Sequence, residues 1–198
     1  MEIDADITKL TPDIRYLDDM REVLFDQEYA KNAENSPLYF MYRKVTQENG
    51  INHSITVVPA KMLGQEFVKT KGHVHIGPFQ EIYTVIKGEA LYLMQKTEGE
   101  HVVDVYAVEA GPGDSIIIPV GYGHITINPS ETEDLRTGDW TSENCRSDYS
   151  LFEKLQGACY YYTLGGWVKN EHYKNVPPLR FEEPLKEIPK DLEFLKGK

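Results

Sequence analysis

The sequence has few cysteines and few basic residues, and both shortages narrow its possible functions. Only two cysteines occur in 198 residues, Cys145 and Cys159, which is too few for a disulfide framework and fits a reducing compartment. The 32 acidic residues outnumber the 21 lysines and arginines, and the formal net charge of −11 disfavours nucleic acid and anionic lipid as partners. An anionic substrate would therefore need a local basic site.

Several signatures of other protein classes are also missing. No apolar run is long enough to span a membrane, and the acidic residues 1–6 do not form a signal-peptide pattern, so we expect a cytoplasmic protein. The sequence lacks the Gly-x-Ser-x-Gly motif of hydrolases as well as the glycine-rich loops of nucleotide-binding proteins. The chain length and an apolar fraction of 40% predict one folded domain.

The pattern along the chain predicts a mostly β protein. Thr11, Pro12 and the spacing of the apolar residues behind them predict a short N-terminal helix. Short runs rich in Val, Ile, Tyr and Thr follow, separated by turns such as Asn49-Gly50, which predicts a sandwich or barrel. We expect an N-terminal extension over residues 1–36, a β-barrel over 37–170 and an extended tail over 171–198. The predicted strands are Leu38–Val45, Ser54–Val58, Glu66–Lys69, Glu81–Ile86, Ala90–Gln95, Val102–Val108, Ser115–Ile118, His124–Ile127 and Ala158–Thr163.

Three histidines and one glutamate have the spacing of metal ligands. His73 and His75 lie two positions apart, so in a strand they point to the same face. Glu81 begins the next apolar run, and a short loop over residues 76–80 can return its carboxylate to the same place. His124 would supply the fourth ligand from a separate hairpin. Such a set suits iron, manganese, nickel, cobalt or zinc and leaves coordination positions open for a substrate.

These residues resemble the two motifs of the cupin superfamily. His73-x-His75, then Glu81 and Gly88, resembles the first motif, although five residues rather than three or four precede the glutamate. Residues 113–128, with His124 among them, match the spacing of the second motif throughout. The alternative is an exposed His-x-His on an edge strand, but two spaced motifs agree on the metal site. The resemblance implies a cupin double-stranded β-helix, or jelly-roll, barrel.

A longer resemblance, over about residues 37–149, is to the cupin-type glucose-6-phosphate isomerases. The string Thr70-Lys71-Gly72-His73-x-His75 carries it, together with a tyrosine-bearing strand upstream and the Glu81-x-Tyr83 pair. Ser147 stands where some members have a pocket histidine. No pattern indicates a role for residues 131–146. Lys69 and Lys71 are candidate positive charges for a phosphate group. The resemblance implies that His73, His75, Glu81 and His124 bind metal and that Tyr39, Thr56, Thr70, Lys71, Gly72, Tyr83 and Tyr149 bind substrate.

The resemblance further implies an isomerase that interconverts glucose 6-phosphate and fructose 6-phosphate in glycolysis and gluconeogenesis. It suggests one divalent transition metal per chain, with Fe(2+) as the expected ion, and a homodimer. Glu81 would carry a proton between C1 and C2 with help from Tyr83, whereas a hydride shift would use the same ligands. Two alternatives stay open: a metal-dependent cupin dioxygenase, and a cupin that binds sugar without catalysis.

Overall fold

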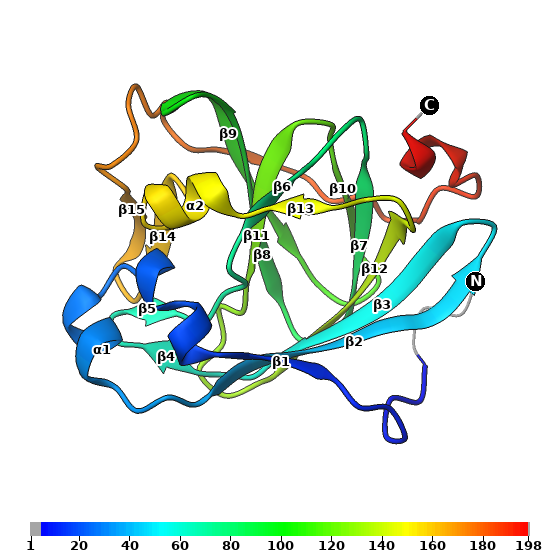
Figure 1. The fold of residues 1–198 in the computed structure, drawn as a ribbon, viewed down its shortest axis with the longest axis horizontal. Helices are drawn as coiled ribbons and strands as arrows, with labels where there is room; N and C mark the ends of the chain where they lie inside the picture. The colour runs from blue at the N-terminus through cyan, green and yellow to red at the C-terminus, as the bar shows by residue number, and fades with distance from the viewer. Residues whose placement is uncertain (1–4, 198) are drawn as a thin grey trace.

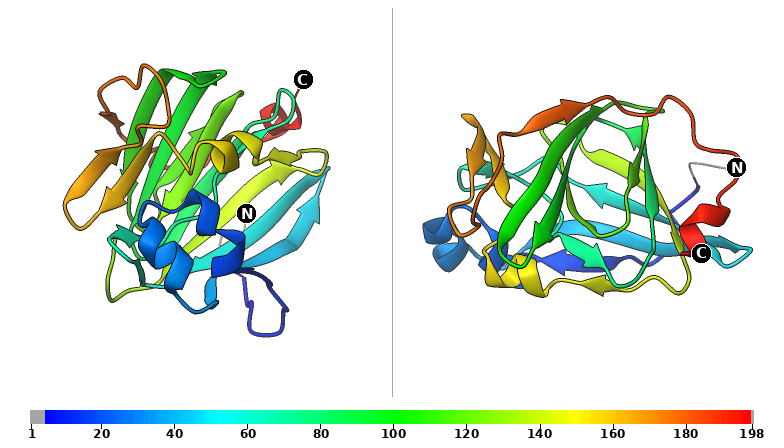
Figure 2. Two further views of the ribbon diagram at one scale, coloured as in Figure 1. Left: turned by 60° about the vertical axis from the view of Figure 1, so that its left-hand side comes forward. Right: turned by 90° about the horizontal axis from the view of Figure 1, so that it is seen from above.

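Two six-stranded sheets face each other and enclose the main core (Figures 1 and 2). The computed structural model describes residues 5–197. In strand order, the first sheet contains β1 (Asp13–Tyr16), β2 (Pro37–Glu48), β3 (Ile51–Val58), β12 (Leu135–Ser142), β7 (Glu81–Lys87) and β10 (Ser115–Ile118). The second contains β13 (Ser147–Asp148), β6 (His73–His75), β11 (Tyr122–Ile127), β8 (Ala90–Glu98), β9 (His101–Ala110) and β16 (Arg180–Glu182).

Most of the smaller elements cover one end of this sandwich, whereas the C-terminal helical turn lies at the other (Figure 1). A four-stranded sheet contains β15 (Gly166–Lys169), β14 (Tyr160–Thr163), β5 (Glu66–Phe67) and β4 (Met62–Leu63). The helical segments are all short: η1 (Leu17–Asp19), η2 (Arg21–Val23), α1 (Gln27–Asn32), α2 (Ser150–Lys154) and η3 (Glu193–Lys196). Among the residues described, no helix is both long enough and apolar enough to cross a membrane.

The predicted all-β jelly-roll class is confirmed, and each of the nine predicted strands overlaps an observed strand. The two large sheets remain separate hydrogen-bonded units, so they form a sandwich rather than one closed barrel. Buried residues of both sheets, such as Val85, Leu93 and Ile125, meet between them. The Asn49-Gly50 turn joins β2 to β3 with φ angles of 51° and 75°, which is the left-handed geometry expected of a tight hairpin.

The helix predicted to open at Thr11 is wrong. Asp13–Tyr16 instead forms β1, which pairs antiparallel with β2 and brings Arg15 opposite Tyr39. The apolar residues that follow in sequence, including Leu17 and Val23, belong to two 3₁₀ turns and are buried. Their spacing therefore reflects burial rather than one continuous helix. The short helix of this region, α1, begins later, where the Asp26 side chain accepts a hydrogen bond from the Tyr29 N–H.

The segment over residues 131–146, which had no predicted role, contains a central strand. β12 lies between β3 and β7 in the first sheet. Its sequence, Leu-Arg-Thr-Gly-Asp-Trp-Thr-Ser, is mostly polar, yet six of its eight residues are buried. Apolar alternation does not identify such a strand, because polar side chains occupy positions that face the interior.

The tail follows the outside of the second sheet and then crosses to the first (Figure 1). β16 pairs in parallel with β9, and Ser115 and Leu185 form an isolated bridge at the edge of β10. Leu195 then packs with Trp140 and Ile82 in a second, smaller apolar cluster. The tail therefore covers edges of both sheets, which protects them from pairing with other chains.

Candidate metal centre and adjoining pocket

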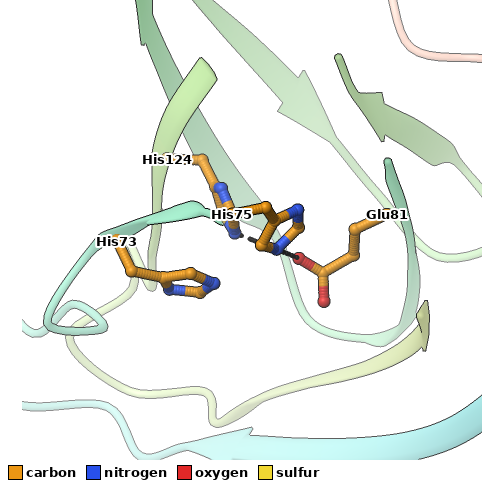
Figure 3. Close-up of side chains that lie close together, drawn as sticks. All are labelled: His73, His75, Glu81 and His124. Atoms are coloured by element: carbon orange, nitrogen blue, oxygen red, sulfur yellow. Dashed lines mark ion pairs between the residues drawn. The ribbon is translucent and has the colours of Figure 1, made fainter. Parts of the chain in front are cut away.

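The four predicted metal ligands meet in one place, although they come from both large sheets (Figure 3). His73 and His75 are the two ends of β6, and His124 lies opposite His73 on the neighbouring strand β11. Glu81 is the first residue of β7, in the other sheet. The loop over residues 76–80 crosses from one sheet to the other, so the long spacing before the glutamate spans the sandwich.

One candidate ligand atom from each residue lies within 4.8 Å of the others. The Glu81 Oε2 atom is 3.2 Å from His75 Nε2 and 3.1 Å from His124 Nε2. The side chains of His75, Glu81 and His124 are almost fully buried, whereas His73 is partly exposed. Three imidazoles and a carboxylate are thus gathered at a place that water reaches poorly.

This arrangement fits a metal ion. Among the residues described, Glu81 Oε2 and His124 Nε2 are buried and lack a hydrogen-bond partner, despite lying so close together. Buried polar atoms normally find partners, so a pair of unpartnered ligand atoms at this distance indicates a group between them. The donor set of three nitrogens and one oxygen suits a first-row transition metal. The cluster could therefore hold such an ion, while its identity is not fixed by the ligands.

The charges at the cluster depend on one another. Burial alone would raise the pKa of Glu81, but the close contacts with His124 and His75 hold this pKa well below its ordinary value. Burial would lower the pKa of His75, but contacts with Cys145 and Glu81 raise it to about 10. Burial and the neighbouring His124 keep the pKa of His73 well below its ordinary value. Binding of a metal ion at His75 would be coupled to loss of the proton from its imidazole.

A cavity of about 320 Å³ opens beside the cluster. His73, His75 and Glu81 form part of its wall, and polar residues form most of the remainder. All seven residues predicted to bind substrate line this cavity: Tyr39, Thr56, Thr70, Lys71, Gly72, Tyr83 and Tyr149. Ser147 also lines it. The structure thus brings the predicted site residues together, and their individual roles stay predictions.

The loop over residues 70–72 is held tightly against the second sheet. Thr70 Oγ1 accepts a hydrogen bond of 2.9 Å from the Thr126 N–H, which leaves the threonine hydroxyl hydrogen free to donate. Gly72 has a φ of +85°, and a Cβ atom there would lie 2.5 Å from the Phe152 ring and 2.6 Å from Ile125. Only glycine satisfies both the backbone angle and the contact.

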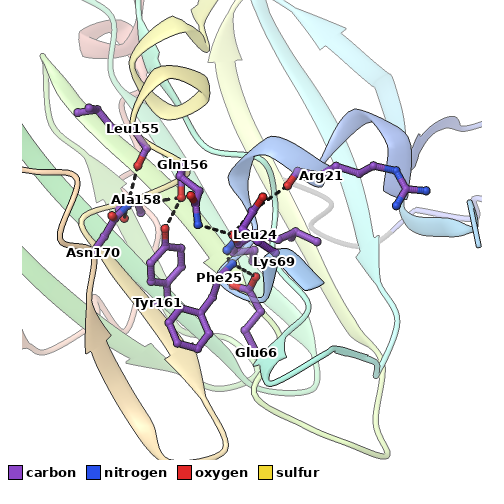
Figure 4. Close-up of polar contacts among 11 residues, drawn as sticks. Arg21, Leu24, Phe25, Glu66, Lys69, Leu155, Gln156, Ala158, Tyr161 and Asn170 are labelled. Carbon is purple, nitrogen blue, oxygen red and sulfur yellow. Dashed lines mark hydrogen bonds and ion pairs between the residues drawn. The ribbon is translucent and has the colours of Figure 1, made fainter. Parts of the chain in front are cut away.

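The two lysines of this segment do not provide a free positive charge. Lys69 does not line the cavity; it is buried on the other side of the loop, where it forms an ion pair with Glu66 and lies over the Tyr161 ring (Figure 4). Lys71 does line the cavity, but its Nζ atom is 2.7 Å from both Glu22 and Glu153. Its charge is already balanced by two carboxylates.

Other charged residues of the cavity were not predicted from the sequence. Arg15 reaches it from β1, and Arg43 and Lys44 reach it from an irregularity in the pairing of β2 with β3, where Lys44 has a φ of 52°. Bulges of this kind redirect side chains near functional sites. No motif marks these residues, because they lie far from the histidines in sequence and only strand pairing brings them near.

Besides Glu81 and Glu143, the carboxyl group of Asp139 on β12 lines the cavity. It is almost fully buried. Burial and the negative charge of Glu81 raise the pKa of Asp139 to about 8. No sequence pattern marks this residue, since its strand was itself not predicted.

Comparison with known proteins identifies the family. The family model described as "Glucose-6-phosphate isomerase (GPI)" matches residues 15–178, which is most of the chain. The chain belongs to this family. Glucose-6-phosphate isomerase from Thermococcus kodakarensis is 32% identical over 120 residues, covering 58% of this chain and 61% of that protein. The protein of the same name from Thermococcus litoralis is 32% identical over 124 residues, covering 60% and 63%.

Within the glucose-6-phosphate isomerase family, this chain thus spans about three fifths of the length of the curated relatives it matches. The matched residues 15–178 include the four candidate ligands, the seven predicted substrate-binding residues and Arg15. Among solved structures, an oxalate oxidase in complex with the substrate analogue glycolate is similar over 56% of this chain and 54% of its own, with a TM-score of 0.43 and 20% identity.

Proposed function

We propose that this protein is an isomerase that interconverts glucose 6-phosphate and fructose 6-phosphate, a reaction of glycolysis and gluconeogenesis. The observation that carries the proposal is the cluster of three histidines and Glu81 at a polar cavity, in a chain of the glucose-6-phosphate isomerase family. The relatives bear that name, and the matched residues include the whole cluster.

We infer that His73, His75, Glu81 and His124 hold one divalent ion, and we propose Fe(II). When bound, such an ion supplies Lewis acidity that polarises a sugar carbonyl oxygen. The remaining chemistry falls to the side chains around it. Because the ligand atoms are buried, water competes poorly for the positions that sugar oxygens would occupy.

Glu81 is the candidate base for the isomerisation. Moving the carbonyl group from C1 to C2 requires one hydrogen to leave one carbon and reach the other, and a carboxylate beside both carbons can carry it as a proton. The low pKa of Glu81 keeps the carboxylate ionised at neutral pH. The Tyr83 hydroxyl contacts Glu81, and burial raises the pKa of Tyr83 well above its ordinary value, so this phenol stays protonated and able to donate to a sugar oxygen.

The other end of the substrate would meet neutral donors. The hydroxyl groups of Thr56 and Thr70 and the Gly72 amide line the same cavity as the histidines. Several convergent donors bind an anionic group well in a site sheltered from water. This set supports a phosphorylated sugar as the substrate rather than an apolar one.

The experiment that tests the proposal combines metal content with turnover. The metal-loaded protein should convert fructose 6-phosphate to glucose 6-phosphate in a coupled assay, and His124→Ala should lose both bound metal and at least ~100-fold of the activity. His172→Ala is the matched control, because His172 is exposed and outside the cavity. A chelator should abolish turnover, and a divalent ion should restore it.

Full activity in His124→Ala, or oxygen consumption by the metal-loaded protein without isomerisation, would contradict the proposal. Exchange of substrate hydrogen with deuterated solvent would support proton transfer through Glu81, whereas complete retention would favour a hydride shift. We also propose that the protein is cytoplasmic, with Cys145 and Cys159 as free thiols, and that it is a homodimer, which sedimentation equilibrium would test.

A further inference from the structure

A phosphate group held by the neutral donors of this cavity would bind more tightly beside a cation that is not already paired. The cationic side chains of its wall are Arg15, Arg43, Lys44, Lys71 and Arg146. Lys71 is excluded by its two carboxylate partners at 2.7 Å. Arg43 forms an ion pair of 2.8 Å with Asp13, and its side chain is 54% exposed. The candidate cations are thereby reduced to the remaining three.

Lys44 and Arg146 are exposed at the rim of the cavity. The Arg146 guanidinium already donates to the backbone carbonyls of Glu143 and Cys145, at 2.8 and 2.7 Å. Exposed cations contribute little to binding because water and salt screen their charges. Arg15 is therefore the strongest candidate.

Arg15 is only partly exposed. The negative charge of Asp19 acts on it, but among the residues described no carboxylate lies within ion-pair distance of its guanidinium group. Its Nε atom is buried without a hydrogen-bond partner. Its side chain contacts the phenol of Tyr39, the residue opposite it on β2. A guanidinium group has five donors in a planar fork, so Arg15 keeps donors available for a ligand.

Arg15 and the metal ligand His73 lie beside the same tyrosine. The Arg15 Cζ atom is 5.9 Å from the centre of the Tyr149 ring, and that ring is 5.4 Å from the His73 ring. One ligand in the cavity could therefore reach both Arg15 and the metal ligands. The Tyr39 hydroxyl, beside Arg15, accepts a hydrogen bond of 3.3 Å from the Lys71 N–H, next to Gly72.

We propose that Arg15 is the residue whose charge binds the phosphate group of the substrate, together with the Tyr39 hydroxyl and the donors of residues 70–72. This inference rests on the proposed function, since it assumes a phosphorylated sugar with its carbonyl end at the histidines. Arginine binds phosphate through two parallel hydrogen bonds, which also fixes the orientation of the substrate. Arg15 thus sets the preference for phosphorylated over neutral sugars.

The test measures binding and turnover in Arg15→Met and Arg15→Lys, with Arg43→Met as the matched comparator from the same cavity. Isothermal titration of the metal-loaded protein with inorganic phosphate and with fructose 6-phosphate should show at least ~10-fold weaker binding in Arg15→Met. Arg15→Lys should lose less, because it retains the charge but not the fork. Arg43→Met should lose less than Arg15→Met. Circular dichroism checks that each variant is folded.

The two proposals fail in different ways. If phosphate binding depends on Arg15 but no isomerisation occurs, the anion site stands and the isomerase proposal falls. If isomerisation occurs and Arg15→Met binds inorganic phosphate within twofold of the unchanged protein, the Arg15 proposal falls. The KM for fructose 6-phosphate should rise in Arg15→Met, while any weak turnover of unphosphorylated fructose should not fall. An equal loss for both sugars would also contradict the specific role.

Discussion

Replacement of Lys69 by methionine should destabilise the protein without affecting phosphate binding. The side chains of Lys69 and Glu66 are 2% and 0% exposed and form an ion pair with each other (Figure 4). The Glu66 carboxylate also accepts a hydrogen bond from the Phe25 N–H, and the Lys69 ammonium group lies 4.9 Å from the centre of the Tyr161 ring. Methionine preserves most of the side-chain volume but removes the positive charge.

The expected cost follows from the carboxylate that remains. Removing one partner of a buried ion pair typically costs about 3–5 kcal/mol, because the other charge stays buried without compensation. The single Phe25 amide offsets only part of this. A Glu66→Gln/Lys69→Met double variant removes both charges, so it should recover at least half of the lost free energy of unfolding.

The loss should also depend on pH. Burial already raises the pKa of Glu66 above its ordinary value, although Lys69 opposes this effect. In Lys69→Met that opposition is gone, so the pKa of Glu66 rises further. A group whose pKa is raised by folding contributes stability below its unfolded pKa and loses it as pH rises through the folded pKa. The variant should therefore be closer to the unchanged protein at pH 5 than at pH 8.

Urea unfolding of the metal-free proteins at both pH values, followed by circular dichroism, measures these differences. A cost below ~1 kcal/mol at pH 8, or a double variant no more stable than Lys69→Met, would refute the reasoning. The titration with inorganic phosphate should give the same affinity as the unchanged protein, because Lys69 does not line the cavity. Weaker phosphate binding in a folded Lys69→Met protein would restore Lys69 as a candidate for the site.

Two further substitutions test the loop over residues 70–72 and the buried carboxyl group of Asp139. Gly72→Ala should cost about 1–3 kcal/mol more unfolding free energy than Gly113→Ala, and it should also raise the KM for fructose 6-phosphate more. Both glycines have a left-handed φ, but only a side chain at Gly72 would clash with Phe152. Equal losses in the two variants would contradict the contact argument. Asp139→Asn should make the stability of the metal-free protein less dependent on pH. The pKa of Asp139, raised to about 8, makes its ionisation above neutral pH unfavourable in the folded state. Between pH 5 and pH 8.5 the unchanged protein should therefore lose at least ~1.4 kcal/mol more unfolding free energy than the variant. Urea unfolding across this range would show the difference, and parallel curves for the two proteins would exclude it.

The sequence alone determined the class of fold and the four candidate ligands. Strand periodicity and turn residues suffice for the nine predicted strands, because alternate burial and hairpin geometry are local properties of the chain. The spacing of the candidate ligands predicts their convergence for the same reason. His73 and His75 share a face of one strand, and Glu81 follows after a single loop. Apolar spacing failed at residues 13–24, where burial against the sandwich produced an edge strand and 3₁₀ turns instead of one helix.

Only the tertiary structure decided which charges are available at the site. Lys69 and Lys71 adjoin the ligand segment in sequence, yet the fold pairs both with carboxylates, those of Glu22, Glu66 and Glu153. Arg15 is distant in sequence from the histidines, and the pairing of β1 with β2 brings it into their cavity. Whether a charge can bind a ligand depends on its partners and its burial, which are set by contacts between distant segments rather than by local pattern.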